Sequence, residues 1–162
     1  MKKKTLISAT AAIIVCSLFA GAIADQYIKF SSKFVKHFRD CESYEETITS
    51  TFESKTFKTN RKIIGWRGGA CRYEETITSP EDQYKLICNF PSIQLDALYS
   101  TMKDRSKKTE VDELEIFAPQ ATSNGGVKYV VLETQPIKGN RAYVAWTKIQ
   151  NNPYFCQPQK IK

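Results

Sequence analysis

The heptapeptide YEETITS occupies residues 44–50 and occurs again, without a change, at residues 73–79. Each copy closely follows a cysteine, Cys41 in the first case and Cys71 in the second. The heptapeptide is rich in tyrosine, threonine and isoleucine, which favour β-strands. An identical heptapeptide at an offset of 29 residues indicates an internal repeat. We interpret it as the duplication of a strand, or of a whole β-hairpin.

Two further strands are predicted beside the repeated ones. Residues 62–66 combine apolar side chains with lysine, and the glycine-rich stretch 67–70 that follows is typical of a tight turn. Residues 84–90 form another largely apolar run after a turn at 79–82. Together with the two heptapeptides, these segments predict a four-stranded antiparallel meander over residues 44–90.

Helices are predicted on either side of the meander. Residues 25–40 carry apolar side chains at helical spacing and basic side chains elsewhere. The aromatic residues of that stripe are Tyr27, Phe30, Phe34 and Phe38. Pro91 ends the last strand, and residues 92–106 have an apolar face and a basic end that suit a second helix.

The last third of the chain predicts a hairpin between irregular segments. Residues 107–126 are polar and end in a Ser-Asn-Gly-Gly run, so we expect a mobile loop or linker. Residues 127–134 and 142–147 favour strands joined by a turn at 138–140, and residues 151–162 predict an irregular tail. The predicted fold is therefore α+β: an N-terminal helix, a four-stranded antiparallel meander, a second helix and a C-terminal β-hairpin, stapled by disulfides.

The first 24 residues have the pattern of a secretory signal peptide. Three lysines at positions 2–4 precede an uncharged run from 5 to 24, which ends in Ala-Ile-Ala. We predict cleavage between Ala24 and Asp25, which leaves 138 of the 162 residues as one domain, 25–162, in the periplasm or outside the cell. The alternative is an uncleaved membrane anchor, since the uncharged run approaches the ~20 residues of a membrane span.

The charge balance does not point to nucleic acid. The whole chain has a formal net charge of +7, but the predicted mature chain has 21 basic and 17 acidic residues and a net charge of +4. Lysines are scattered and mixed with acids rather than gathered in a stripe with exposed aromatic residues. Nucleic acid is therefore not an expected partner, and a membrane is one only if the signal is uncleaved.

Four cysteines remain in the predicted mature chain, and Cys16 is lost with the signal. An even number of cysteines in an oxidising compartment, with no Cys-x-x-Cys pair, predicts two disulfides rather than a metal site or a redox pair. Three pairings are possible among Cys41, Cys71, Cys88 and Cys156. We favour Cys71 with Cys88, because the turn between them would bring them nearly opposite, and therefore Cys41 with Cys156.

The acidic residues of the repeat are the candidate site. Glu45, Glu46, Glu74 and Glu75 could converge, because both copies start at the same end of the meander. Paired carboxylates can bind calcium or act in acid–base catalysis. Alternation along a strand instead places Glu45 and Glu46 on opposite faces, and it predicts a solvated strand face or cross-strand pairs with lysine. His37 is the sole histidine, and the sequence predicts no catalytic, cofactor-binding or metal-ligating residue.

Three functions remain open at the level of sequence. A rigid disulfide-bonded scaffold without a catalytic motif favours a non-enzymatic binding, inhibitory or envelope-accessory module, whose partner is another envelope or extracellular protein or a small ligand. The acidic cluster gives a second possibility, a small secreted carboxylate-based hydrolase. The third is a membrane-anchored pilin-like subunit. Its elements follow the order found in type IV pilins, but the glycine–phenylalanine signature with a nearby glutamate is missing.

Overall fold

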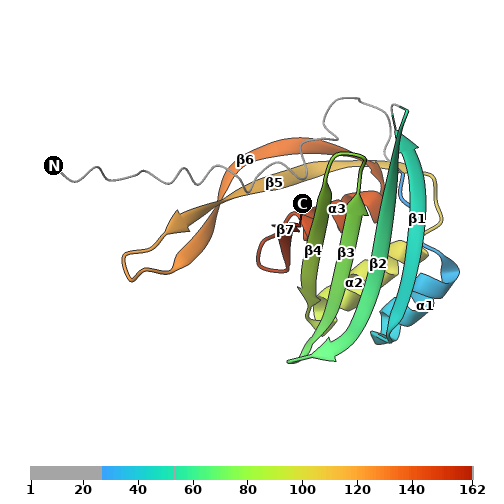
Figure 1. Ribbon diagram of the computed structural model, residues 1–162, viewed down its shortest axis with the longest axis horizontal. Coiled ribbons are helices and arrows are strands. Elements are labelled where there is room, and N and C mark those ends of the chain that lie inside the picture. The colour runs from blue at the N-terminus through green and yellow to red at the C-terminus, as the bar shows by residue number, and fades with distance from the viewer. Residues whose placement is uncertain (1–26, 53, 162) are drawn as a thin grey trace.

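The computed structural model describes residues 27–52 and 54–161 (Figure 1). The predicted signal peptide and its cleavage site lie outside the described residues. The elements along the chain are α1 (Ser32–Asp40), β1 (Tyr44–Phe52), β2 (Lys55–Arg67), β3 (Ala70–Thr78), β4 (Gln83–Phe90), α2 (Ser92–Lys103), β5 (Thr109–Ala121), β6 (Val127–Asn140), α3 (Arg141–Gln150) and β7 (Cys156–Lys160).

The strands form two separate sheets. The first has the order β1-β2-β3-β4-β7, with every neighbouring pair antiparallel. The second is a two-stranded ribbon of β5 and β6, which projects away from the body in Figure 1. The helices gather on one face of the larger sheet. The α+β fold with a helix, a four-stranded meander, a second helix and a hairpin is thus confirmed.

The two copies of the heptapeptide lie on either side of β2 in the same register. Identical side chains therefore meet the same β2 residues from both flanks. Three rows illustrate this register: Ile63 lies between Tyr44 and Tyr73, Lys62 between Glu45 and Glu74, and Arg61 between Glu46 and Glu75. Among the described residues, a duplication of the whole hairpin is not evident.

Helix α1 is shorter than predicted. It begins after Ser31, whose side-chain oxygen accepts a hydrogen bond from the backbone N–H of Phe34 and so caps the helix. It ends at Cys41, which takes a left-handed conformation with φ 52°. The stripe holds from Phe30 onward, while Tyr27 lies outside the helix and is half exposed.

The C-terminal third differs most from the prediction. Residues 142–147, predicted as a strand, belong to the helix α3. The side chain of Asn140 accepts from the N–H of Tyr143 and caps this helix, so the segment read as a hairpin turn is a helix start. Residues 107–126, predicted as a loop, contain the strand β5, which pairs with β6 along its whole length. The hairpin is therefore β5–β6.

The tail is also ordered where an irregular segment was predicted. Residues 156–160 form β7, which pairs with β4 at the edge of the sheet. In this register Cys156 lies directly opposite Cys88. The tail is thus held both by backbone pairing and by a covalent bond.

The favoured disulfide pairing is wrong. The bonds join Cys41 to Cys71 and Cys88 to Cys156, with Cα–Cα distances of 5.7 and 4.1 Å. The reason is the register of β3 and β4, which places Phe90 opposite Cys71 and Cys88 two residues away. The end of α1 brings Cys41 to the start of β3 instead, and β7 supplies the partner of Cys88.

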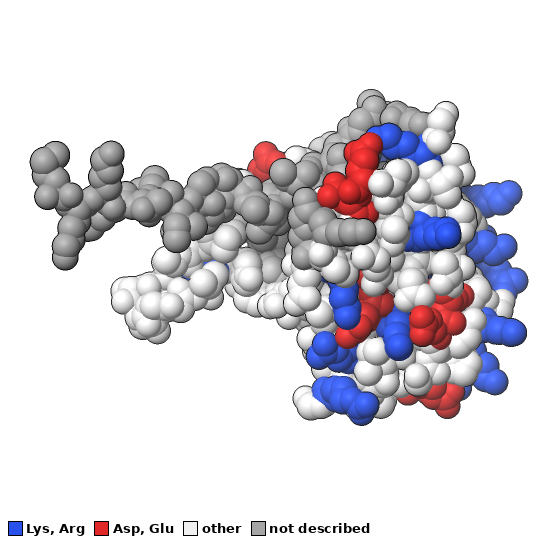
Figure 2. Space-filling model, in the orientation of Figure 1, with Lys and Arg blue, Asp and Glu red and all other residues white. Residues whose placement is uncertain are grey.

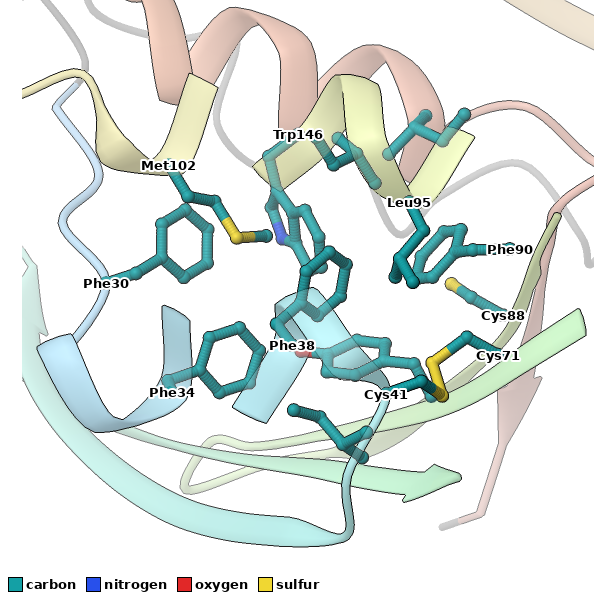
Figure 3. Packing of buried hydrophobic residues seen from close by; sticks show 14 of the residues in the cluster. Phe30, Phe34, Phe38, Cys41, Cys71, Cys88, Phe90, Leu95, Met102 and Trp146 are labelled. Atoms are coloured by element: carbon teal, nitrogen blue, oxygen red, sulfur yellow. A yellow bond between two sulfur atoms is a disulfide. The ribbon is translucent and has the colours of Figure 1, made fainter. Parts of the chain in front are cut away.

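An aromatic cluster fills the space between the helices and the larger sheet (Figure 3). Trp146 of α3 is 3% exposed, and its ring centroid lies 5.2 Å from Phe30, 5.9 Å from Phe38 and 5.3 Å from Tyr73. Burial of such rings is the main stabilising contribution in a domain of this size. Of the helices described, none is both long and apolar enough to cross a membrane.

Candidate functional site

The four candidate glutamates divide between the two faces of the sheet. Glu45 and Glu74 lie on the outer face, on either side of Lys62. The carboxylate of Glu45 is 3.4 Å from the amine of Lys62, and that of Glu74 is 2.6 Å from the amine of Lys85. These two glutamates therefore form cross-strand pairs with lysine, as alternation along the strands predicts.

Glu46 and Glu75 lie on the inner face, with Arg61 between them. The Nη1 atom of Arg61 is 3.8 Å from Oε1 of Glu46, and its Nε atom is 3.5 Å from Oε2 of Glu75. The three side chains are 7%, 12% and 6% exposed for Arg61, Glu46 and Glu75. The structure thus brings two of the predicted residues together, but around a guanidinium that the sequence did not single out.

Neighbouring hydroxyls add hydrogen bonds to this buried charge network, which we define as Glu46, Arg61 and Glu75. Within the network, Oε1 of Glu46 and the Nε and Nη1 atoms of Arg61 form ion pairs but no hydrogen bond among the described residues. The hydroxyl of Tyr73 donates to Glu75 at 2.5 Å, and that of Ser31 donates to Glu46 at 2.5 Å. Burial raises the pKa of Tyr73 well above its ordinary value, so the phenol keeps the proton that it donates. Each carboxylate is thus held by an ion pair with Arg61 and by one hydrogen bond from a hydroxyl.

His37, the remaining titratable candidate, is also held in place by local contacts. The Nδ1 atom of His37 lies 3.2 Å from the carboxylate of Glu42, and its ring stacks on Tyr44 with centroids 4.7 Å apart. In the part of the chain that the structure describes, no three His, Cys, Asp or Glu side chains gather as a metal site would require. The structure gives His37 a packing role at the edge of the core.

The ion pair between Glu74 and Lys85 on the outer face of the sheet predicts a loss of stability at acid pH. Lys85, with Arg72, holds the pKa of Glu74 below its ordinary value. A lowered folded-state pKa contributes stability above the unfolded pKa, about 4.3, and that contribution is lost as the pH falls through the folded pKa. We expect Glu74→Gln to cost about 1 kcal/mol at pH 7 and less at pH 3, as measured by urea unfolding at both values.

Glu45→Gln is the matched control for this prediction. Glu45 flanks Lys62 from the other strand but is 52% exposed, so its replacement should change stability less at pH 7. A loss for Glu74→Gln that is the same at both pH values would show that the carboxylate charge is not responsible.

A concave groove runs beside β5. It encloses about 450 Å³ between β5, α2 and α3, and we call it the β5 groove. Its apolar walls are formed by Leu98, Leu114, Phe117, Val144, Ile149 and Phe155. Concave, mainly apolar surfaces with a few polar groups are the usual places for binding sites.

The charged groups of the β5 groove are three acidic side chains on β5 and two basic side chains on α3, namely Glu110, Asp112, Glu115, Arg141 and Lys148. Asp112 lies 2.6 Å from the amine of Lys148, which holds the pKa of Asp112 below its ordinary value. Glu110 and Glu115 are exposed and, within residues 27–52 and 54–161, form no ion pair. The groove thus offers apolar walls and two carboxylates that a positively charged group could reach.

Beyond the groove the ribbon of β5 and β6 projects from the body. We call residues 116–134 the distal ribbon. Val127, Val131 and Leu132 are 64%, 47% and 62% exposed there. Tyr154, in the loop after α3, touches it: its hydroxyl donates to the carbonyl of Tyr129 at 3.3 Å. Exposed apolar side chains gathered in this way are typical of contact surfaces.

Sequence reasoning missed both the β5 groove and the distal ribbon, because it treated residues 107–126 as a loop. Two signals could have found them. The alternation of Leu114, Ile116 and Ala118 with other residues has the period of a strand, and Asn124-Gly125 lies between two such segments at the position of a turn.

Comparisons of the chain with protein-family models, with curated proteins and with solved structures found no match.

Proposed function

We propose that this chain is an exported, non-enzymatic binding module whose β5 groove takes up a segment of another extracytoplasmic protein. Two disulfides are typical of an oxidising compartment outside the cytoplasm, which supports export. The observation that carries the proposal is the groove itself, in which one wall is a β-strand whose partner β6 lies on its other side.

The chemistry of the groove defines the segment that would bind. Its walls suit apolar side chains, and the carboxylates of Glu110 and Glu115 suit lysine or arginine. A segment that alternates apolar and basic residues would satisfy both when extended along β5. A strand edge also offers backbone hydrogen-bonding groups, which gives affinity in strand addition.

The other two functions have less support. A carboxylate-based hydrolase would need an acid that is free to exchange protons, whereas Glu46 and Glu75 are both committed to Arg61. Glu46 does border a shallow pocket of about 230 Å³, lined by Phe30, Ser31 and Ile48 among others. A pilin-like subunit would need the N-terminal apolar segment as an anchor, and that segment lies outside the described residues.

Nuclear magnetic resonance of the purified protein, with its disulfides intact, can test the proposal. The probes are two synthetic ten-residue peptides, one that alternates leucine with lysine and one that alternates leucine with glutamate. We expect the leucine–lysine peptide to shift amide signals of α2, α3 and β5 in a saturable way. The leucine–glutamate peptide should leave them unchanged, because like charges repel at the groove.

Paired variants make this test specific. The double variant Glu110→Lys and Glu115→Lys should weaken binding of the leucine–lysine peptide at least tenfold. Glu113→Lys is the matched control, since Glu113 is exposed on the same strand but does not line the groove. Equal weakening by both variants, or signal changes spread over the outer face of the sheet, would contradict the proposal.

A further inference from the structure

The distal ribbon lacks the additional strands or the packed face that usually stabilise a small sheet. A hairpin of two strands is marginal in water by itself, and three or more strands, or a packed face, are usually required. The sheet of β5 and β6 has two strands among the described residues, and most side chains of residues 118–134 are exposed. Additional strands would supply the missing backbone pairing and cover the exposed valines.

The two edges of the ribbon differ in charge. β5 carries Glu110, Asp112, Glu113 and Glu115 and no basic residue, so two β5 edges would repel one another. Contact with the body does not distinguish the two strands. Asn151 donates to the carbonyl of Glu115 on β5, and Tyr154 donates to the carbonyl of Tyr129 on β6. β6 instead mixes two lysines with one glutamate. The edge of β6 is therefore the one suited to self-pairing.

The distal ribbon is also neutral where the rest of the chain is basic. Its 19 residues contain a single lysine, Lys128, and a single glutamate, Glu133, whereas the whole chain has a net charge of +7. Figure 2 shows the visible tip of the ribbon without charged side chains, while the body carries many of both signs. Two copies of this segment can therefore approach without the repulsion that the bodies would exert.

We infer that β6 of one molecule pairs antiparallel with β6 of a second copy, so that the two ribbons become one four-stranded sheet. The centre of this contact is the apolar run of Val130, Val131 and Leu132. A two-fold axis there makes the contact isologous, so the assembly closes as a dimer instead of growing into a filament. The β5 groove stays open in this dimer, and the inference does not depend on the proposed function.

Sedimentation of the purified protein over a range of concentrations tests the inference. We expect a dimer at tens of micromolar, and a shift to monomer, with at least tenfold weaker association, for the double variant Val131→Lys and Leu132→Lys. The matched control is Val111→Lys, which changes a valine that is 70% exposed on β5 and should leave the dimer intact. All these side chains are exposed, so unfolding curves recorded at concentrations where every protein is monomeric should stay unchanged.

Single cysteines locate the contact. The four cysteines of the described chain are bonded to one another, so a new cysteine adds a free thiol. Because disulfide-bonded cysteines usually have Cα atoms about 4.4–6.8 Å apart, at least one of Val130→Cys, Val131→Cys and Leu132→Cys should form a covalent dimer on oxidation, and Val111→Cys should not. A monomer at every concentration, or a dimer that survives the double lysine variant, would overturn the inference. Peptide binding in the groove should be unaffected in either case.

Discussion

Replacing Arg61 with methionine is expected to lower the free energy of unfolding by about 3–5 kcal/mol, as measured by urea denaturation at pH 7. Arg61 is 6% exposed and is the counterion of both Glu46 and Glu75. Without it, two buried carboxylates face one another across β2 with no positive charge between them. Its guanidinium also lies 4.7 Å from the centre of the Phe30 ring, so the variant loses that contact as well.

The adjacent residue provides the matched control. Lys62 stands between Glu45 and Glu74 as Arg61 stands between Glu46 and Glu75, but its side chain is 46% exposed. Lys62→Met should therefore cost no more than about 1 kcal/mol, because water screens the charges that remain. A similar loss for both variants would mean that burial does not determine how much the central cation, Arg61 or Lys62, stabilises the fold.

A combined variant separates charge from packing. Adding Glu46→Gln and Glu75→Gln to Arg61→Met removes both unpaired charges while it keeps side chains of similar size. We expect the combined variant to regain at least half of the stability lost by Arg61→Met alone. If it regains nothing, the loss comes from the missing contacts of the arginine side chain and not from its charge.

Removal of the disulfide between Cys88 and Cys156, by changing both to alanine, is expected to cost roughly 4 kcal/mol in the loop-entropy model. The bond closes a loop of 68 residues and fixes the short strand β7 against β4. Without it, β7 has only backbone pairing with β4 to hold it to the sheet. Urea unfolding measures the loss, and hydrogen exchange should show β7 exchanging before the rest of the sheet.

The other disulfide is the natural comparison. The bond between Cys41 and Cys71 closes a loop of 30 residues, so its removal should cost about 0.7 kcal/mol less in the same model. Peptide mapping without reduction should first recover these two linked pairs. Recovery of Cys71 linked to Cys88 would refute the register of β3, β4 and β7 described above.

The meander could be predicted because its signals are local. Each strand of residues 44–90 shows strand-forming residues bounded by glycine, proline or polar turns, and the repeat suggested related strands before any pairing was known. The division of the glutamates between two faces also followed from alternation alone. What could not be predicted was Arg61, because its burial between two glutamates depends on the register of three strands.

The C-terminal third was mispredicted because local preference and tertiary context disagree there. Tyr143, Val144 and Trp146 favour strands, yet Ala142, Trp146 and Ile149 recur at helical spacing and face the core. The cap at Asn140 favours the helix, because its side chain accepts a hydrogen bond from the N–H group of Tyr143 in the first turn. Burial of Trp146 among aromatic rings then stabilises a helix that propensity alone would not favour.

The predicted pairing of Cys71 with Cys88 is wrong because of a small offset between two strands. A turn between Cys71 and Cys88 does bring the two strands together, but the register offsets these residues by two positions. A shift of two residues keeps both on the same face and still leaves each nearer to another partner. The order of the strands in the meander is therefore readable from sequence, whereas the connectivity between buried cysteines requires the exact offsets of the strands.

The order of the disulfides has a consequence for how the chain matures. The first of the four described cysteines is joined to the second, and the third to the fourth. A polypeptide that crosses a membrane from its N-terminus delivers Cys71 while Cys41 is the sole earlier thiol among these four. Oxidation in order of arrival then gives the native bonds directly, and reshuffling by an isomerase is not required. In the proposed export, Cys88 would emerge 68 residues before its partner Cys156.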